Sequence, residues 1–135
     1  MLEPVIIQLP KIFDRRGNLS FLESNNHVPF DIKRVFWIYD VPGGAVRGGH
    51  AYRESQEFII ALSGSFDVVL NNGFEAMRFS LNRSYYGLYI PSMIWRSIEN
   101  FSTNSLALAL SSTLFQEDDY IRNIADFQRL KNQLI

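Results

Sequence analysis

Hydrophobic and polar residues alternate with a period near two along most of this chain. Residues 30–41, FDIKRVFWIYDV, show the pattern most clearly, with an alternating series that runs through Ile32, Arg34, Phe36 and Ile38. Comparable short runs occupy residues 5–9, 19–23, 75–81, 85–91, 95–101 and 105–113, and residues 57–73 indicate two strands joined at Ser63–Gly64. The pattern therefore predicts many short β-strands.

Turn-forming residues separate these runs. DRRGNLS, residues 14–20, predicts a turn at Gly17, and VPGGAVRGGH, residues 41–50, predicts a loop. Asn and Gly tolerate positive φ, so NNG, residues 71–73, predicts a hairpin turn. Strands about ten residues apart favour a single all-β domain over residues 1–135, either a sandwich or a barrel. The edge strands of such a domain could pair in a dimer.

Only the end of the chain has helical periodicity. In DDYIRNIADFQRLKNQLI, Tyr120, Ile121, Ile124, Phe127 and Leu130 recur at helical spacing, with acidic residues first and basic residues later. Asp118 or Asp119 is a suitable N-cap. We expect this short C-terminal helix to serve packing and to carry no chemistry.

Composition narrows the classes of function. Of the 135 residues 47% are hydrophobic and 20% charged, which is ordinary for a soluble globular domain. A net charge of −1 argues against a nucleic-acid partner, but it leaves room for arginines that bind a single phosphate group. The absence of cysteine excludes disulfides and thiolate chemistry. No signal peptide or membrane span is evident, so we expect a cytoplasmic protein with no membrane partner.

One glycine-rich stretch, residues 43–65, carries the most informative spacing. Gly44 precedes His50 by six residues, Tyr52 follows by two, Glu57 by five more and Gly64 by a further seven. This spacing resembles the first motif of the cupin family, with Tyr52 in place of that motif's second histidine. Pro91, Arg96 and Asn100 resemble the second motif, with Arg96 in place of a metal-binding histidine. In a small barrel, His50 and Tyr52 could share one wall of the cavity.

These substitutions argue against a metal site. The four positions that the metal-binding cupins use read His50, Tyr52, Glu57 and Arg96. Imidazole and carboxylate are good metal ligands, but a phenol is an uncommon ligand and a guanidinium carries positive charge. The other histidine, His27, lies in NNHVPF, which reads as a loop. The sequence therefore predicts no metal.

A more specific resemblance extends over nearly the whole chain. The stretches DRRGNL, PFDIKRVFWIYDV, RGGHAY, LSGSFDVVLNNG, YYGLYIPSMIW and DDYIRNIADF are similar to those of the WxcM-like sugar-nucleotide 3,4-ketoisomerases. The resemblance implies a cupin double-stranded β-helix and a homodimer, often with an exchanged N-terminal strand. It also implies a dTDP-linked keto-deoxyhexose as substrate, no cofactor, and a role in deoxy-amino-sugar and surface polysaccharide biosynthesis.

Such a reaction needs acid–base groups only. Moving a carbonyl from C4 to C3 requires removal of the C3 proton, an enediol, and protonation at C4. His50 fits the role of base because the ordinary pKa of histidine lies near neutrality. Tyr52 stands where the family has a second histidine, and its phenol could donate a hydrogen bond to an enediolate oxygen.

Other residues are candidates for binding the substrate. Arg16 and Arg47 could hold a pyrophosphate, because a guanidinium can form paired hydrogen bonds to phosphate oxygens. Tyr86 and Trp95 could stack on a base or a sugar, although core packing explains them equally well. The remaining candidates are Arg34, Glu57 and Arg96.

Two alternative functions compete with the isomerase. Loss of the second histidine would suit a non-catalytic protein that binds a sugar nucleotide, or a partner subunit of a sugar-biosynthetic enzyme. The cupin spacing would also suit a metal-dependent dioxygenase or isomerase, which would require metal at the four positions described above.

Overall fold

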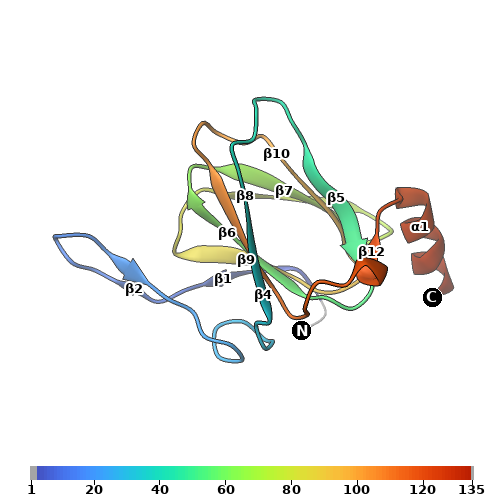
Figure 1. Ribbon diagram of the computed structural model, residues 1–135, viewed down its shortest axis with the longest axis horizontal. Helices are drawn as coiled ribbons and strands as arrows, with labels where there is room; N and C mark the ends of the chain where they lie inside the picture. The colour runs from blue at the N-terminus through green and yellow to red at the C-terminus, as the bar shows by residue number, and fades with distance from the viewer. Residues whose placement is uncertain (1–2, 135) are drawn as a thin grey trace.

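Two five-stranded antiparallel sheets form the body of the protein in the computed structural model, which describes residues 3–134 (Figure 1). The first sheet has the order β1 (Val5–Gln8), β9 (Tyr86–Ile90), β6 (Glu57–Ser63), β11 (Leu106–Ser111) and β4 (Arg34–Tyr39). The second has the order β12 (Tyr120–Ile121), β5 (Arg47–Tyr52), β10 (Trp95–Glu99), β7 (Phe66–Asn71) and β8 (Ala76–Leu81). A hairpin of β2 (Lys11–Ile12) and β3 (Leu19–Ser20), a 3-10 turn η1 (Glu117–Asp119) and a helix α1 (Ile124–Gln133) complete the structure.

The main core lies between the two sheets. Ile59 and Leu88 from the first sheet and Val68 and Leu70 from the second are fully buried in one apolar cluster. This follows from the period of two, because every second residue of a strand points inward. The arrangement is the all-β cupin double-stranded β-helix that the sequence predicted, with a short C-terminal helix at one end and the β2–β3 hairpin extending away at the other (Figure 1).

Local sequence accounts for several elements directly. Exposure alternates along β4 as the period of two requires. The predicted turn at Gly64 joins β6 to β7, and Gly64 has a φ of +66°. A Cβ at Gly64 would lie 2.5 Å from Ser102 Oγ and 2.8 Å from Ser105 Cα, so both the backbone conformation and the space require glycine.

The prediction of a loop over residues 41–50 was wrong at its end. Arg47–Tyr52 form β5, which pairs with β10 through Arg96↔His50 and Ile98↔Arg47, with a shift of register between the two pairs. Gly48 adopts a φ of +72° at this irregularity. Pairing with a neighbouring strand thus outweighs the low strand propensity of the glycines.

The predicted start of the C-terminal helix was also wrong. The helix α1 begins at Ile124, and its N-cap is Asn123, whose side chain accepts hydrogen bonds from the backbone N–H groups of Ala125 and Asp126. Tyr120 and Ile121 instead form β12, which pairs with β5 through Tyr120↔Tyr52 and Ile121↔Ala51. The helix packs Phe127 against Trp95, with ring centroids 5.9 Å apart, on the outer face of the second sheet.

The outer face of the first sheet is covered only in part. Phe58, Ile60 and Tyr89 are buried there beneath Val28 and Phe30. Along β4, however, the outward side chains of this face are exposed. The exposed apolar residues of β4 are Val35, Trp37 and Tyr39. Those of the hairpin and the residues beside it are Ile12, Phe13, Leu19 and Phe21. Within residues 3–134, no helix has the length and hydropathy needed to cross a membrane.

Candidate functional site

His50 lies inside the barrel near one end. It is 8% exposed and comes from the irregular part of β5, opposite Arg96 of β10. Its Nε2 atom is buried and has no hydrogen-bond partner. An unpaired buried nitrogen is costly, so a histidine in this state is available to a ligand.

Two tyrosine rings surround His50. The ring centroid of Tyr52 lies 4.8 Å from that of His50, and the ring of Tyr120 lies 5.0 Å from His50 and 4.8 Å from Tyr52. All three contacts have edge-on geometry, which aromatic rings prefer over face-to-face stacking. The three rings form a compact cluster, and two strands distant in sequence contribute to it.

Burial sets the protonation states in this cluster. It lowers the pKa of His50 to about 3, and the positive charges of Arg96, Arg122 and Arg34 add to the effect. His50 is therefore neutral near pH 7, and the same burial makes it a weaker base than an exposed histidine. Burial also raises the pKa of Tyr52, and the negative charge of Glu57 raises it further. The Tyr120 hydroxyl adds to this shift, although the two hydroxyl groups do not meet in hydrogen-bonding geometry.

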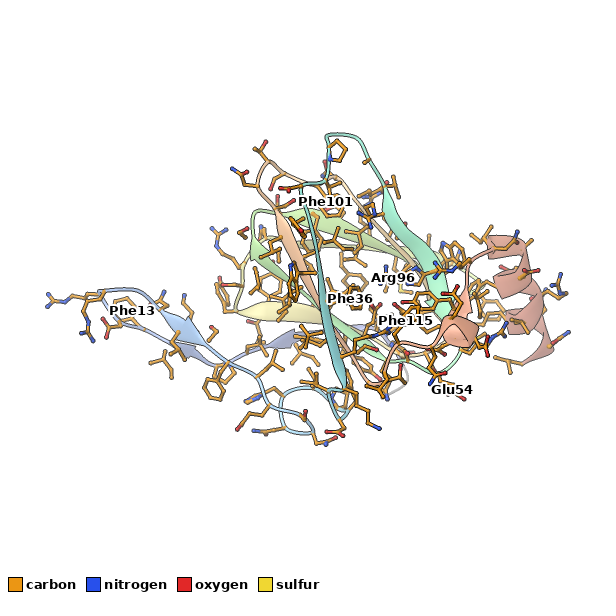
Figure 2. All side chains as sticks on the ribbon, in the orientation of Figure 1. Phe13, Phe36, Glu54, Arg96, Phe101 and Phe115 are labelled. Carbon is orange, nitrogen blue, oxygen red and sulfur yellow. The ribbon has the colours of Figure 1, made fainter. Side chains whose placement is uncertain are left out.

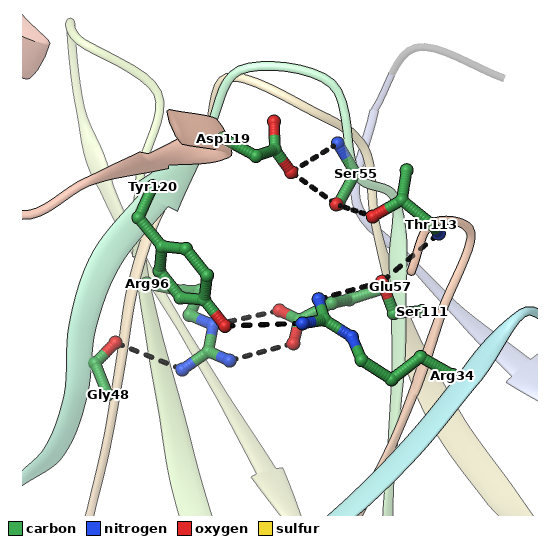
Figure 3. Close-up of polar contacts among 9 residues, drawn as sticks. All are labelled: Arg34, Gly48, Ser55, Glu57, Arg96, Ser111, Thr113, Asp119 and Tyr120. Carbon is green, nitrogen blue, oxygen red and sulfur yellow. Dashed lines mark hydrogen bonds and ion pairs between the residues drawn. The ribbon is translucent and has the colours of Figure 1, made fainter. Parts of the chain in front are cut away.

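Glu57 and Arg96 form an ion pair at the floor of this cluster (Figure 3). Arg96 Nε donates to Glu57 Oε1 at 2.8 Å and Arg96 Nη2 donates to Glu57 Oε2 at 2.7 Å, and both side chains are 1% exposed. The third nitrogen, Nη1, donates to the carbonyl oxygen of Gly48 at 3.0 Å. A Cβ at Gly48 would lie 2.1 Å from this Nη1, so glycine is required here.

This ion pair bears on the metal question. Glu57 is the carboxylate of the four positions that metal-binding cupins use, and Arg96 occupies both of its oxygens. No group of three or more histidine, cysteine, aspartate or glutamate side chains within residues 3–134 could hold a metal ion. The residues at these positions therefore do not fit a metal centre.

Arg34, the first residue of β4, borders the cluster on the side of the first sheet. Its Nη2 donates to Ser111 Oγ at 3.2 Å and its Nη1 makes a long contact of 3.5 Å to the hydroxyl of Tyr120 (Figure 3). Its guanidinium also lies over the rings of Phe36, at 5.5 Å, and Phe115, at 5.7 Å. The Nε of Arg34 is buried without a partner.

The unpaired polar atoms are concentrated here. Within the described part of the chain, three buried side-chain nitrogen or oxygen atoms lack a hydrogen-bond partner: Arg34 Nε, His50 Nε2 and the Tyr52 hydroxyl oxygen. All three belong to this one cluster. Because folded proteins satisfy nearly all such atoms, their concentration at one place marks it as the candidate active site.

A buried carboxylate holds the segment that carries Tyr120. Asp119 accepts hydrogen bonds from the backbone N–H groups of Glu54, at 2.6 Å, and Ser55, at 3.2 Å, and from the hydroxyl of Ser55. That hydroxyl also contacts Thr113 Oγ1 at 2.5 Å (Figure 3). These bonds tie η1 to the β5–β6 turn and to the end of β11.

A neighbouring cavity shares Asp119 with this network. Its volume is about 480 Å³, and its lining includes basic side chains, acidic side chains and hydroxyls: Lys33, Arg53, Glu54, Asp118, Asp119, Ser112 and Thr113. None of the three clustered rings lines it.

The structure brings together five of the residues that the sequence singled out: Arg34, His50, Tyr52, Glu57 and Arg96. The other four lie elsewhere. Trp95 points outward beside Arg96 and packs on Phe127. Tyr86 is the first residue of β9. Its hydroxyl donates a hydrogen bond to Asn82 Oδ1 at 2.7 Å.

The two candidate pyrophosphate-binding arginines are exposed. Arg47 begins β5 on the surface. Arg16 pairs with Asp14 at 2.9 Å on the β2–β3 hairpin, which projects far from Arg96, as the position of Phe13 on the same hairpin shows (Figure 2).

Sequence analysis missed Tyr120. The helical spacing that starts at Tyr120 placed it on a packing helix. Asn123 is a favourable N-cap residue, and Asp126 places an acidic side chain in the first turn of the helix. That signal would have moved the helix start to residue 124 and left Tyr120 in extended chain.

Fold and site together define a cupin in which a histidine, a tyrosine, a glutamate and an arginine stand at the four positions where metal-binding cupins hold metal ligands. The chain belongs to the FdtA family, described as WxcM-like, C-terminal, whose model matches residues 3–132.

Similar proteins with known names come from several bacteria. The TDP-4-oxo-6-deoxy-alpha-D-glucose-3,4-oxoisomerase of Aneurinibacillus thermoaerophilus is 34% identical over 128 residues, which cover 95% of this chain and 92% of that protein. The WlaRB TDP-quinovose 3,4-ketoisomerase of Campylobacter jejuni is 41% identical with a TM-score of 0.89, over 93% of this chain and 97% of that one.

A third relative has been solved with a sugar nucleotide. A mutant of the 3,4-ketoisomerase QdtA from Thermoanaerobacterium thermosaccharolyticum, in complex with TDP-4-keto-6-deoxyglucose, is 31% identical with a TM-score of 0.95. The match covers 98% of this chain and 96% of that chain.

Proposed function

We propose that this protein is a nucleotide-sugar 3,4-ketoisomerase that moves the carbonyl of a TDP-linked 4-keto-6-deoxyhexose from C4 to C3. The observation that carries the proposal is the concentration of unpaired buried polar atoms around a neutral histidine. The relatives that cover nearly the whole chain are named as 3,4-keto- or oxoisomerases of TDP sugars. The product would serve deoxy-amino-sugar and surface polysaccharide biosynthesis.

The reaction requires an unprotonated base, and His50 is unprotonated at pH 7, although its low pKa makes it a weaker base than an exposed histidine. An imidazole nitrogen of His50 would take the C3 proton, and the resulting imidazolium would return it to C4. A hydroxyl group beside His50 would hydrogen-bond the sugar oxygens as charge develops on them. Neither step needs a metal or another cofactor.

Basic groups near the pocket suit the diphosphate of the substrate. Arg34 faces the rings, and Lys33 and Arg53 line the adjoining cavity of about 480 Å³. Guanidinium and ammonium groups bind phosphate oxygens well. We assign the reacting carbons to the space beside His50.

We also propose that the protein works as a homodimer in the cytoplasm. Arg16 lies on a hairpin that extends away from its own pocket, so it could reach a substrate only in a second copy (Figure 1). The exposed apolar side chains of β4 and the hairpin would be covered in such a dimer. A chain without cysteine suits a reducing compartment.

Proton NMR in deuterated water tests the activity. Purified protein incubated with TDP-4-keto-6-deoxyglucose should exchange the C3 proton for deuterium and form a 3-keto product. His50→Asn should lower the rate by about 10²–10⁴-fold, because it removes the base.

The chain offers a matched control in its second histidine. His27 Nδ1 accepts a hydrogen bond from the backbone N–H of Glu23 at 2.8 Å, in a turn outside the pocket, so His27→Asn should keep wild-type activity. Thermal stabilisation by TDP without exchange or product would favour the non-catalytic binding function instead. Activity that depends on stoichiometric added metal would contradict the acid–base proposal.

A further inference from the structure

We propose that the hydroxyl of Tyr120 is the proton donor and acceptor that works with His50 on the sugar oxygens. The inference rests on the proposed isomerase function and deepens it. It assigns a reaction step to the C-terminal segment and leaves Tyr52, the residue at the second-histidine position, without a proton-transfer step.

The position of Tyr120 follows from strand pairing. β12 lies against β5 with Tyr120 opposite Tyr52, so the Tyr120 ring reaches the cluster from the sheet edge. Its centroid lies 5.0 Å from that of His50. A substrate carbon beside the imidazole would therefore have its attached oxygen within reach of the Tyr120 hydroxyl.

Two cations lie against Tyr120. Arg122 sits over the ring with its guanidinium carbon 4.3 Å from the centroid, and Arg34 Nη1 contacts the hydroxyl oxygen at 3.5 Å (Figure 3). Positive charge at this point favours a negative oxygen on a bound substrate, such as that of an enediolate, although Glu117 pairs with Arg122 and reduces its contribution. Tyr120 is also partly exposed, so a ligand can reach it.

Tyr52 lacks these properties. It is 4% exposed, and its hydroxyl oxygen is buried without a hydrogen-bond partner. Burial and the negative charge of Glu57 both raise its pKa, which opposes the loss of a proton. The face of its ring lies 5.8 Å from the Arg96 guanidinium carbon, so it also covers the buried ion pair.

The two groups balance the reaction. His50 takes the proton from C3 and the C3–H electron pair forms the C3=C4 bond, while the carbonyl pair moves to O4, which takes the proton of the Tyr120 hydroxyl. The Tyr120 oxygen then takes the proton of O3, and the O3–H pair forms the C3=O3 bond. The C3=C4 pair finally takes the proton from the His50 imidazolium at C4, and both residues return to their starting states.

A pair of phenylalanine variants tests this assignment. Tyr120→Phe and Tyr52→Phe each keep the ring and remove one oxygen. We expect Tyr120→Phe to lower kcat for TDP-4-keto-6-deoxyglucose by about 10²–10³-fold, with KM changed less than about threefold. Tyr52→Phe should lower kcat by less than Tyr120→Phe does, because the proposal gives its hydroxyl no proton to transfer. Its Tm should stay equal or rise, since it removes an unpaired buried oxygen.

The outcomes separate the two proposals. An active wild-type protein with equal kcat in Tyr120→Phe would overturn the role of Tyr120 and leave the isomerase function standing. A loss of kcat confined to Tyr52→Phe would overturn it as well. A wild-type protein that neither exchanges the C3 proton nor forms product would overturn both. Thermal melts of the two variants show whether a loss of kcat reflects unfolding.

Discussion

The buried polar residues of the candidate site differ chiefly in whether an oppositely charged side chain contacts them. Arg96 and Glu57 are buried as deeply as any side chain of the core, but each satisfies the other. His50 is buried beside three arginines and has no acidic partner of its own. Burial opposes charge in both places, but contact with an opposite charge offsets this cost in the ion pair, whereas the imidazole has no such contact and stays neutral.

The low pKa of His50 predicts a loss of stability in mild acid. The folded protein keeps His50 neutral down to about pH 3, whereas an unfolded histidine takes up a proton below about pH 6.5. Between these values the unfolded state binds the extra proton, so the free energy of unfolding falls as the pH falls, by at most about 1.4 kcal/mol per pH unit from this group.

Urea unfolding at about pH 7 and about pH 5 measures this effect. The wild-type protein should lose more stability between the two conditions than His50→Asn, which cannot be protonated. Equal losses in the two proteins would contradict a neutral buried His50. His27→Asn serves as the control and should behave as the wild type.

At the scale of elements, the η1–β12 segment matters most for the site. It is only five residues long, and it has no apolar face of its own comparable to a core strand. Its position depends on β-pairing with β5 and on the hydrogen bonds that Asp119 accepts. Those bonds explain why Asp119 does not cap the helix: its carboxylate is used by the β5–β6 turn.

Removing the Asp119 carboxylate should loosen this segment. Asp119→Ala leaves the N–H groups of Glu54 and Ser55 and the Ser55 hydroxyl without their acceptor, which should cost about 2–4 kcal/mol of unfolding free energy. Asp118→Ala, at the exposed neighbouring position, should change it by less than about 0.5 kcal/mol. Urea titrations of both variants give the comparison, and similar values for the two would show that Asp119 does not anchor the segment.

At the scale of the whole molecule, exposed apolar residues are unevenly distributed. Trp37 and Tyr39 are 56% and 59% exposed on the outer face of β4, and Phe13 on the hairpin is 76% exposed. The outer face of the second sheet, by contrast, packs against α1. The exposed apolar side chains of β4 lie on one face of its sheet and favour association there.

Charge placed on that face should separate the proposed dimer. Trp37→Arg would put a guanidinium into the apolar contact, so we expect the mass from sedimentation equilibrium to fall from that of two chains to that of one. Phe74→Arg is the matched control, because Phe74 is 71% exposed but lies on the turn between β7 and β8. A monomeric wild-type protein, or a dimer unaffected by Trp37→Arg, would contradict this interface.

The strands and turns of this protein could be predicted from its sequence because their causes are local. A period of two along residues 34–39 and the glycine of the turn at residue 64 can be recognised from neighbouring residues. The resemblance of the HAY stretch and its flanks to a known family added the fold and the role expected of His50. Gly48 and Gly49 led to the wrong prediction of a loop, because strand propensity takes no account of the pairing between β5 and β10.

The sequence by itself thus determined an all-β cupin and singled out His50 as a candidate base. Only the tertiary structure decided that Arg96 joins Glu57 across 39 residues, that His50 is neutral, and that Tyr120 stands beside it. The physical reason is that desolvation, charge and strand pairing depend on residues far apart in the chain. Those contacts exist only once the barrel has closed.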